Sequence, residues 1–83
     1  MKVLIFGASG FIGFASANAF VRAGHTVIGQ TRSAATARIL EQNEIYPLLC
    51  DLEKAEDVAH WHKAIDEADV VIDCKNYDPI FVV

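Results

Sequence analysis

The sequence lacks long apolar runs. Its uninterrupted apolar stretches are only a few residues long, so none approaches the length of a membrane-spanning helix. The amino terminus also lacks the basic, apolar and small-residue regions of a signal peptide. We therefore expect a cytoplasmic chain that does not insert into a membrane.

Basic residues and cysteines are also scarce. Lys and Arg number 7 against 11 Asp and Glu, the net charge is -4, and no basic run is present. Because binding to a phosphate backbone depends on clustered positive charge, we expect no nucleic-acid partner. Cys50 and Cys74 have neither CxxC nor zinc-site spacing, and His60 and His62 fall on different faces of a helix. These features predict reduced thiols and no metal site.

Apolar residues, by contrast, are in excess. They make up 53% of the 83 residues, whereas ordinary soluble domains have roughly 45 to 50%. A chain this short buries only somewhat more than about 60% of the surface that it exposes when unfolded. The excess therefore predicts surface that something else covers, either a carboxy-terminal remainder of the same domain or a second copy in a homo-oligomer.

The apolar pattern alternates along the chain between short runs, typical of strands buried on both faces, and segments with helical spacing. The predicted strands are residues 3–6, 25–30, 45–50 and 70–73, and the predicted helices are residues 12–23, 34–41 and 55–67. With right-handed crossovers, this succession gives a Rossmann-type α/β fold whose parallel sheet has the order 3-2-1-4. We expect residues 1–83 to be the amino-terminal part of one such domain, truncated after the fourth strand. Pro47 cannot donate to a ladder, which suits an edge position for the third strand.

Two helices carry more specific predictions. The inward face of the first helix is predicted to consist of Ile12, Ala15, Ala19, Phe20 and Ala23. Gly24 would end this helix in the left-handed conformation. The inward face of the third helix would consist of Val58, Trp61, Ile65 and Ala68, with Trp61 a core or subunit-contact aromatic.

A glycine-rich turn joins the first strand to the first helix. Its sequence is Gly7-Ala8-Ser9-Gly10-Phe11-Ile12-Gly13, a GxxGxxG spacing. Gly7 permits the tight turn, Gly10 lets the backbone approach a diphosphate, and Gly13 lets the helix pack closely on the sheet. The positive end of the helix dipole and its free N–H groups would bind the diphosphate. The alternative is a loop that is merely flexible, and the missing GK[ST] ending argues against a phosphate loop of the ATPase kind.

The end of the second strand bears on the choice of dinucleotide. Proteins specific for NAD place a carboxylate there, whereas this chain has Gln30-Thr31-Arg32-Ser33. Arg32 can bind a 2′-phosphate through a charge-assisted fork, and Thr31 or Ser33 can add a hydroxyl donor. We therefore expect NADP to be preferred, with NAD possible. Alternatively, Arg32 is a solvated loop arginine and Ser33 caps the second helix.

These motifs resemble the extended or atypical short-chain dehydrogenase/reductases, which include nucleotide-sugar epimerases and NADP-binding reductases. The resemblance covers essentially all 83 positions and rests on KVLIFGASGFIG at 2–13, TRS at 31–33, Asp51-Leu52, and EADVVIDC at 67–74. It implies that Asp51 accepts a hydrogen bond from the adenine amino group and that Leu52 lines the adenine pocket. It also places residues 74–76, which include Cys74 and Lys75, beside the nicotinamide-side ribose. The alternative for Asp51 is the N-cap of the third helix.

The catalytic pair of that family, Tyr-x-x-x-Lys, is absent from these residues. Tyr46 is followed four positions later by Cys50, and Tyr77 by Phe81, so we assign no catalytic residue. The favoured function is the NADP(H)-binding portion of a short-chain-type reductase or of a nucleotide-sugar epimerase/dehydratase. Two alternatives stay open: a stand-alone dinucleotide-sensing or regulatory module without catalysis, and a structural fragment that binds nothing and self-associates.

Overall fold

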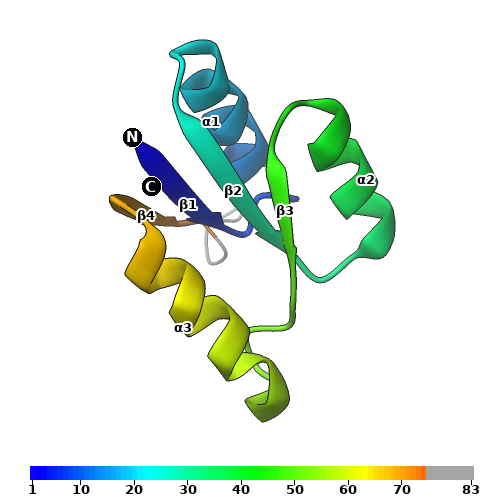
Figure 1. Ribbon diagram of the computed structural model, residues 1–83. Helices are drawn as coiled ribbons and strands as arrows, with labels where there is room; N and C mark the ends of the chain where they lie inside the picture. The colour runs from blue at the N-terminus through cyan, green and yellow to red at the C-terminus, as the bar shows by residue number, and fades with distance from the viewer. Residues whose placement is uncertain (75–83) are drawn as a thin grey trace, which may run out of the picture.

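The computed structural model describes residues 1–74, which form one sheet flanked by helices (Figure 1). The elements in chain order are β1 (Lys2–Phe6), α1 (Phe11–Arg22), β2 (Thr26–Thr31), α2 (Ala34–Gln42), β3 (Tyr46–Leu49), a 3-10 turn η1 (Ala55–Asp57), α3 (Val58–Glu67) and β4 (Val70–Asp73). Each predicted strand and helix is present within a few residues of its expected bounds. The third helix differs most, because its first turn is the separate 3-10 turn η1.

The sheet is parallel throughout and has the order β3-β2-β1-β4, as predicted. The crossover after β1 places β2 on one side of β1, and the crossover after β3 places β4 on its other side. The strand order therefore reverses next to β1. Pro47 lies on β3, an edge strand of the described sheet, where its missing N–H costs no ladder bond. The carboxyl ends of the strands consequently meet at one edge of the sheet.

Buried β1 separates two layers of helix. The side chains of Val3 and Ile5 enter the main core, which includes Ala17 of α1 and Leu40 of α2. Phe6 follows Ile5 and therefore points to the opposite face of the sheet, where it contacts Trp61 of α3 edge to face with ring centroids 6.2 Å apart. Helices α1 and α2 thus cover one face of the sheet and α3 the other (Figure 1).

The predicted inward face of α1 is only partly correct. Ile12 and Phe20 pack against the core, but Ala15, Ala19 and Ala23 are exposed. The residues that are buried in α1 are Gly13 and Ala17. The helix is apolar almost all round, so hydrophobic spacing does not select a face, and the small residues Gly13 and Ala17 allow a close approach where α1 faces the sheet.

The helix ends follow the predicted local chemistry at two positions. Gly24 has φ 89° just after α1, and the Ser33 hydroxyl caps α2 by accepting a hydrogen bond from the Thr36 N–H at 3.2 Å. The predicted inward residues of α3 are half-buried and none is fully buried. None of the helices within residues 1–74 is long and apolar enough to cross a membrane.

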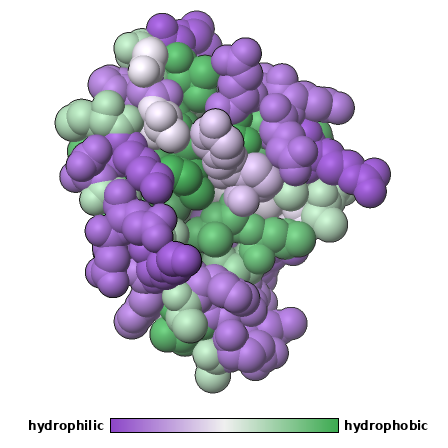
Figure 2. Space-filling model, in the orientation of Figure 1, coloured by the Kyte–Doolittle hydropathy of each residue, from purple (hydrophilic) through white to green (hydrophobic). Residues whose placement is uncertain are grey.

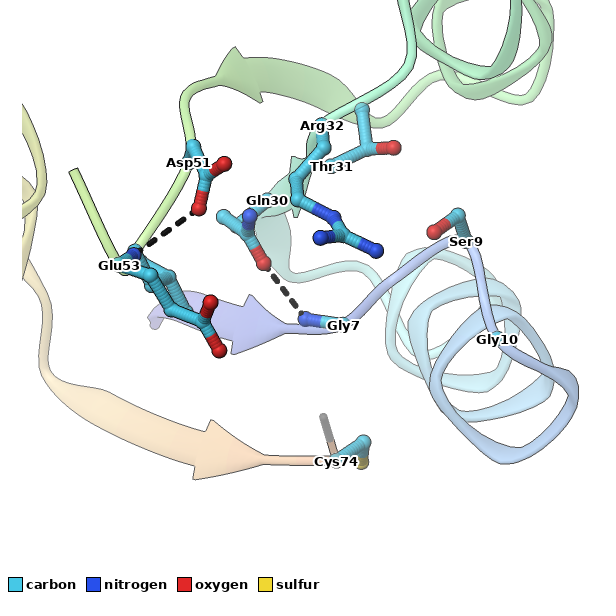
Figure 3. A pocket seen from close by; sticks show the side chains of 10 residues that line it. Gly7, Ser9, Gly10, Gln30, Thr31, Arg32, Asp51, Glu53 and Cys74 are labelled. Carbon is cyan, nitrogen blue, oxygen red and sulfur yellow. Dashed lines mark hydrogen bonds between the residues drawn. The ribbon is translucent and has the colours of Figure 1, made fainter. Parts of the chain in front are cut away.

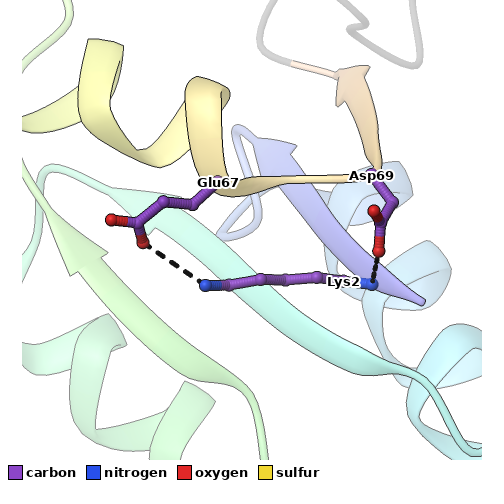
Figure 4. Close-up of polar contacts among 3 residues, drawn as sticks. All are labelled: Lys2, Glu67 and Asp69. Carbon is purple, nitrogen blue, oxygen red and sulfur yellow. Dashed lines mark hydrogen bonds and ion pairs between the residues drawn. The ribbon is translucent and has the colours of Figure 1, made fainter.

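Lys2 ties the beginning of β1 to the segment between α3 and β4 (Figure 4). Its backbone N–H donates to Asp69 Oδ2 at 2.8 Å, and its Nζ lies 3.3 Å from Glu67 Oε2. Both partners of the ion pair are substantially exposed, so we expect it to contribute at most about 1 kcal/mol. The backbone contact is the one that fixes where α3 returns to the sheet.

Candidate functional site

A cavity opens where the carboxyl ends of the strands meet (Figure 3). Its volume is about 340 Å³. The lining residues come from the glycine turn, the end of β2, the segment after β3 and the end of β4: Gly7, Ser9, Gly10, Gln30, Thr31, Arg32, Asp51, Leu52, Glu53 and Cys74. This is the edge of an open α/β sheet at which ligands bind beside a topological switch point.

The glycine turn has the conformation that two of its glycines were predicted to permit. Gly7 has φ 75°, a backbone conformation that side chains disfavour, and its carbonyl accepts a hydrogen bond from the Gly10 N–H at 3.1 Å. A Cβ on Gly13 would overlap the carbonyl oxygen of Gly7. Gly13 is therefore required for α1 to pack against the turn.

Gly10 differs, because nothing within residues 1–74 demands a glycine there. Its φ is -76°, and a Cβ would meet only the Gly7 oxygen, at an ordinary contact distance of 3.4 Å. Gly10 is exposed and lines the cavity. A side chain at Gly10 would reduce the free space beside the turn without disturbing the fold.

Helix α1 begins at this turn without a side-chain cap. Gly10 is its N-cap residue and offers no side-chain acceptor, and the first turn contains no acidic residue. Helix α2 is the contrast, because Ser33 accepts from its first turn. The N–H groups at the beginning of α1 are thus left for a partner of negative charge, which the helix dipole also favours.

The remaining predicted residues of the turn offer backbone groups. The side chain of Phe11 is 82% exposed, and that of Ile12 packs against the core. Neither of these residues lines the cavity, and Gly13 does not line it either. Their N–H groups belong to the uncapped first turn of α1.

At the end of β2, Thr31 and Arg32 line the cavity and Ser33 does not. Arg32 is exposed, and Figure 3 shows its guanidinium reaching over the space beside the glycine turn. Thr31 is buried, and its Oγ1 accepts a hydrogen bond from the Ser33 N–H at 3.2 Å. Ser33, whose hydroxyl is already bonded to the first turn of α2, has the capping role.

Asp51 does not cap the third helix. The N-cap residues of η1 and α3 are Lys54 and Asp57, so the alternative interpretation of Asp51 is wrong. Its Oδ1 instead accepts from the Glu53 N–H at 2.9 Å, and its own N–H donates to Asp57 Oδ2 at 2.8 Å. These bonds fold the segment after β3 into a turn that brings Asp51, Leu52 and Glu53 to the cavity.

Gln30 and Glu53 also line the cavity, although neither was predicted from the sequence. Gln30 is 4% exposed, its Oε1 accepts from the Gly7 N–H at 2.9 Å, and its Nε2 donates to the Cys50 carbonyl at 2.8 Å. The available sequence signal for Gln30 was that a polar residue stands near the carboxyl end of an otherwise apolar strand. Glu53 gave no such signal, because acidic residues are common in the turn before a helix.

The two cysteines are free thiols in buried positions. Burial raises the pKa of the Cys74 thiol, and Asp73 raises it further. Burial also raises the pKa of Cys50, with smaller contributions from Asp57 and Asp51. Both thiols are therefore protonated near neutral pH and are poor nucleophiles, although Cys74 lines the cavity. Lys75, also predicted to line the site, lies outside the described residues.

Fold and site together define a Rossmann-type α/β protein, with a glycine-rich turn between the first strand and an uncapped helix. The model of the NAD dependent epimerase/dehydratase family matches residues 3–78. The chain belongs to this family, whose cofactor is a dinucleotide, and the resemblance found in the sequence is confirmed.

Solved structures agree with this assignment. A crystal structure of TT0495 protein from Thermus thermophilus is 28% identical with a TM-score of 0.71, over 93% of this chain and 33% of that one. A candidate exported protein from Burkholderia pseudomallei is 28% identical with a TM-score of 0.66, over 100% of this chain and 34% of that one. The chain thus spans about a third of the length of these structures. A search of curated proteins gives no significant match.

Proposed function

We propose that residues 1–83 are the amino-terminal, cofactor-binding part of a single dinucleotide-binding domain. The observation that carries this proposal is the uncapped beginning of α1, which opens beside Gly10 onto the cavity. A diphosphate fits this position because the helix N-terminus supplies N–H donors and a positive dipole end. Arg32 is the only cation among the lining residues that the structure describes, against Asp51 and Glu53, so backbone groups must provide most of the attraction.

The other lining residues fit the remaining parts of a dinucleotide. Asp51 and Leu52 would hold the adenine, since Asp51 Oδ2 has no hydrogen-bond partner among residues 1–74. Cys74, at the end of β4, would lie on the nicotinamide side. When bound, the nicotinamide ring supplies hydride transfer. Tyr46, the only tyrosine among residues 1–74, is exposed on β3 and does not line the cavity.

For the cofactor we propose NADP(H) over NAD(H). Arg32 supports this choice, since it is exposed, lies at the cavity and has no ion-pair partner in the described part of the chain. The end of β2 carries no carboxylate that would repel a 2′-phosphate. Glu53 opposes the preference, because its carboxylate also points toward the cavity (Figure 3).

For the whole protein we propose a cytoplasmic short-chain-type reductase or nucleotide-sugar epimerase/dehydratase. Membership of the epimerase/dehydratase family supports this class of reaction. The substrate-binding and proton-transferring residues would then lie outside residues 1–74, in keeping with the fraction of the solved structures that this chain spans.

The test is calorimetric titration with NADPH and NADH of the wild-type chain, Gly10→Ala and Gly24→Ala. Gly10→Ala should weaken NADPH binding about 10- to 100-fold by blocking contacts to a charged group, with little change in unfolding free energy. Gly24→Ala, at φ 89° and remote from the cavity, should lower stability and leave the affinity of the folded protein unchanged. Absence of binding by the wild-type chain at millimolar concentration would refute the proposal.

A further inference from the structure

Gln30 occupies an unusual place, because its uncharged side chain is buried in the wall of a cavity that binds, by our proposal, a charged ligand. Gln30 and Thr31 are the buried polar residues of the described chain. The Gln30 carboxamide is bonded at both ends, to the Gly7 N–H at 2.9 Å and to the Cys50 carbonyl at 2.8 Å. Its backbone carbonyl also accepts from the Ala8 N–H at 2.9 Å. One residue therefore holds the glycine turn by main chain and side chain together.

The two ends of this bridge belong to the two walls of the cavity. Gly7 begins the turn that leads into α1, and Cys50 immediately precedes the turn that carries Asp51. The register pairs Ile5 with Gly29 and Thr31 with Leu49, so Gly7 and Cys50 lie just beyond the last paired positions of β1 and β3. The backbone of β2 still bonds to both walls, because the Gln30 carbonyl accepts from the Ala8 N–H and the Thr31 carbonyl from the Cys50 N–H. The Gln30 side chain adds a second bond to each wall, and Figure 3 shows the one to Gly7.

The bridge also determines which N–H groups are free. The Gly7 N–H is used by Gln30 and the Gly10 N–H by the Gly7 carbonyl. What remains for an anion is the N–H set at the beginning of α1, where the helix dipole is strongest. The bridge thus holds the start of the turn that leads to those groups.

A neutral carboxamide fits both contacts. It accepts through its oxygen and donates through its nitrogen, whereas an ionised carboxylate only accepts and a leucine does neither. A carboxylate would also face the Cys50 carbonyl and add a negative charge beside the position of the diphosphate. A protonated carboxyl, by contrast, has both a donor and an acceptor and could restore the bridge.

We infer that Gln30 is a positioning residue of the cofactor site, which sets the spacing between the glycine turn and the Asp51 turn and must be uncharged to do so. This inference rests on the proposed function for its effect on affinity. Its structural part, the bond that holds the Gly7 N–H, does not depend on any ligand.

The experiment compares Gln30→Glu, Gln30→Leu and Gln42→Glu with the wild-type chain. Gln42 is exposed on α2, so Gln42→Glu makes the same change of charge away from the cavity. Binding of NADP+ is titrated between pH 5.5 and pH 8, and the Gly7 amide exchange rate is measured without cofactor.

Gln30→Glu should bind about tenfold or more weakly than Gln42→Glu at pH 8, since the introduced carboxylate is ionised there. Burial raises the pKa of such a carboxyl, so at pH 5.5 more of it is protonated. The affinity of Gln30→Glu should then lie within about threefold of that of Gln42→Glu. Gln30→Leu should bind weakly at every pH and should exchange the Gly7 amide at least about tenfold faster than the wild-type chain.

Equal affinity of Gln30→Glu and Gln42→Glu at pH 8 would overturn the inference, as would a deficit that does not change with pH. Unchanged exchange of the Gly7 amide in Gln30→Leu would overturn its structural part. If the wild-type chain binds no NADP+ and the Gly7 amide still loses protection in Gln30→Leu, the proposed function fails and the bridge stands.

Discussion

At the scale of the residue, Arg32 is the side chain on which the choice of cofactor depends. Arg32→Ala should weaken NADPH binding by about 1 to 3 kcal/mol, because it removes one partner of a charge-assisted contact. NADH affinity should hardly change, since NADH lacks the 2′-phosphate. Titration of both cofactors measures the difference, with Arg38→Ala, exposed on α2, as the control. Equal losses for NADPH and NADH would show that Arg32 does not discriminate between them.

Glu44 holds a backbone conformation that suits glycine. It follows α2 with φ 62°, where its N–H donates to the Glu41 carbonyl and the next N–H, of Ile45, donates to the Leu40 carbonyl. Glu44→Gly should therefore raise the unfolding free energy by about 1 kcal/mol, measured by urea titration. Glu41→Gly, inside the helix, should lower it by about 1 kcal/mol. A loss of stability in Glu44→Gly would contradict this account.

Sequence predicted single residues well where their role is local. The capping by Ser33 and the left-handed Gly24 follow from chemistry within a few residues of each position. Gln30 was not predictable in this way, because its partners Gly7 and Cys50 lie 23 and 20 residues away. The left-handed conformation of Glu44 was not predictable either, because glutamate does not favour it and the end of α2 adopts it nevertheless.

At the scale of the element, the strands were easier to predict than the face of α1. Val3, Leu4 and Ile5 are completely buried, as expected for a central parallel strand. Both faces of such a strand are buried, so an apolar run predicts it without any decision about which face each residue occupies. The orientation of a helix that is apolar all round depends on how closely it can approach the sheet, and that is decided by Gly13 and Ala17.

Gly13→Ala tests this explanation of α1. The added Cβ would overlap the Gly7 carbonyl and approach its carbon to 2.9 Å, so α1 or the turn must shift. We expect the unfolding free energy to fall by about 1 to 3 kcal/mol, as in other overpacked cores, although alanine has a better helix propensity than glycine. Thermal or urea unfolding measures the loss, and Ala15→Ser on the exposed side of α1 is the control. Unchanged stability would mean that Gly13 is not what sets the approach of α1.

At the scale of the whole molecule, the chain exposes several large apolar side chains. The large apolar residues with high exposure are Met1, Phe11, Ile39, Tyr46, Leu49 and Val71. Figure 2 shows apolar side chains gathered near the centre of one face, beside α3. Part of the apolar excess in the composition therefore lies on the surface, and what covers it stays a prediction.

The β4 edge is where we expect the isolated chain to associate. Among the described residues β4 pairs with β1 alone, and Val71 on this strand is 41% exposed. An edge strand with exposed apolar side chains is a template for pairing with another chain, and a lysine on such an edge opposes that pairing. Val71→Lys should therefore weaken self-association about tenfold or more without unfolding the chain.

Sedimentation equilibrium over a range of concentrations measures the association constant. Ile39→Lys is the matched control, because Ile39 is 48% exposed and lies on α2, away from β4. It removes a similar apolar side chain and adds the same charge, so a general effect of solubility would appear in both variants. If Ile39→Lys dissociates the chain as strongly as Val71→Lys, or if the wild-type chain is a monomer at every concentration, association does not occur through the edge of β4.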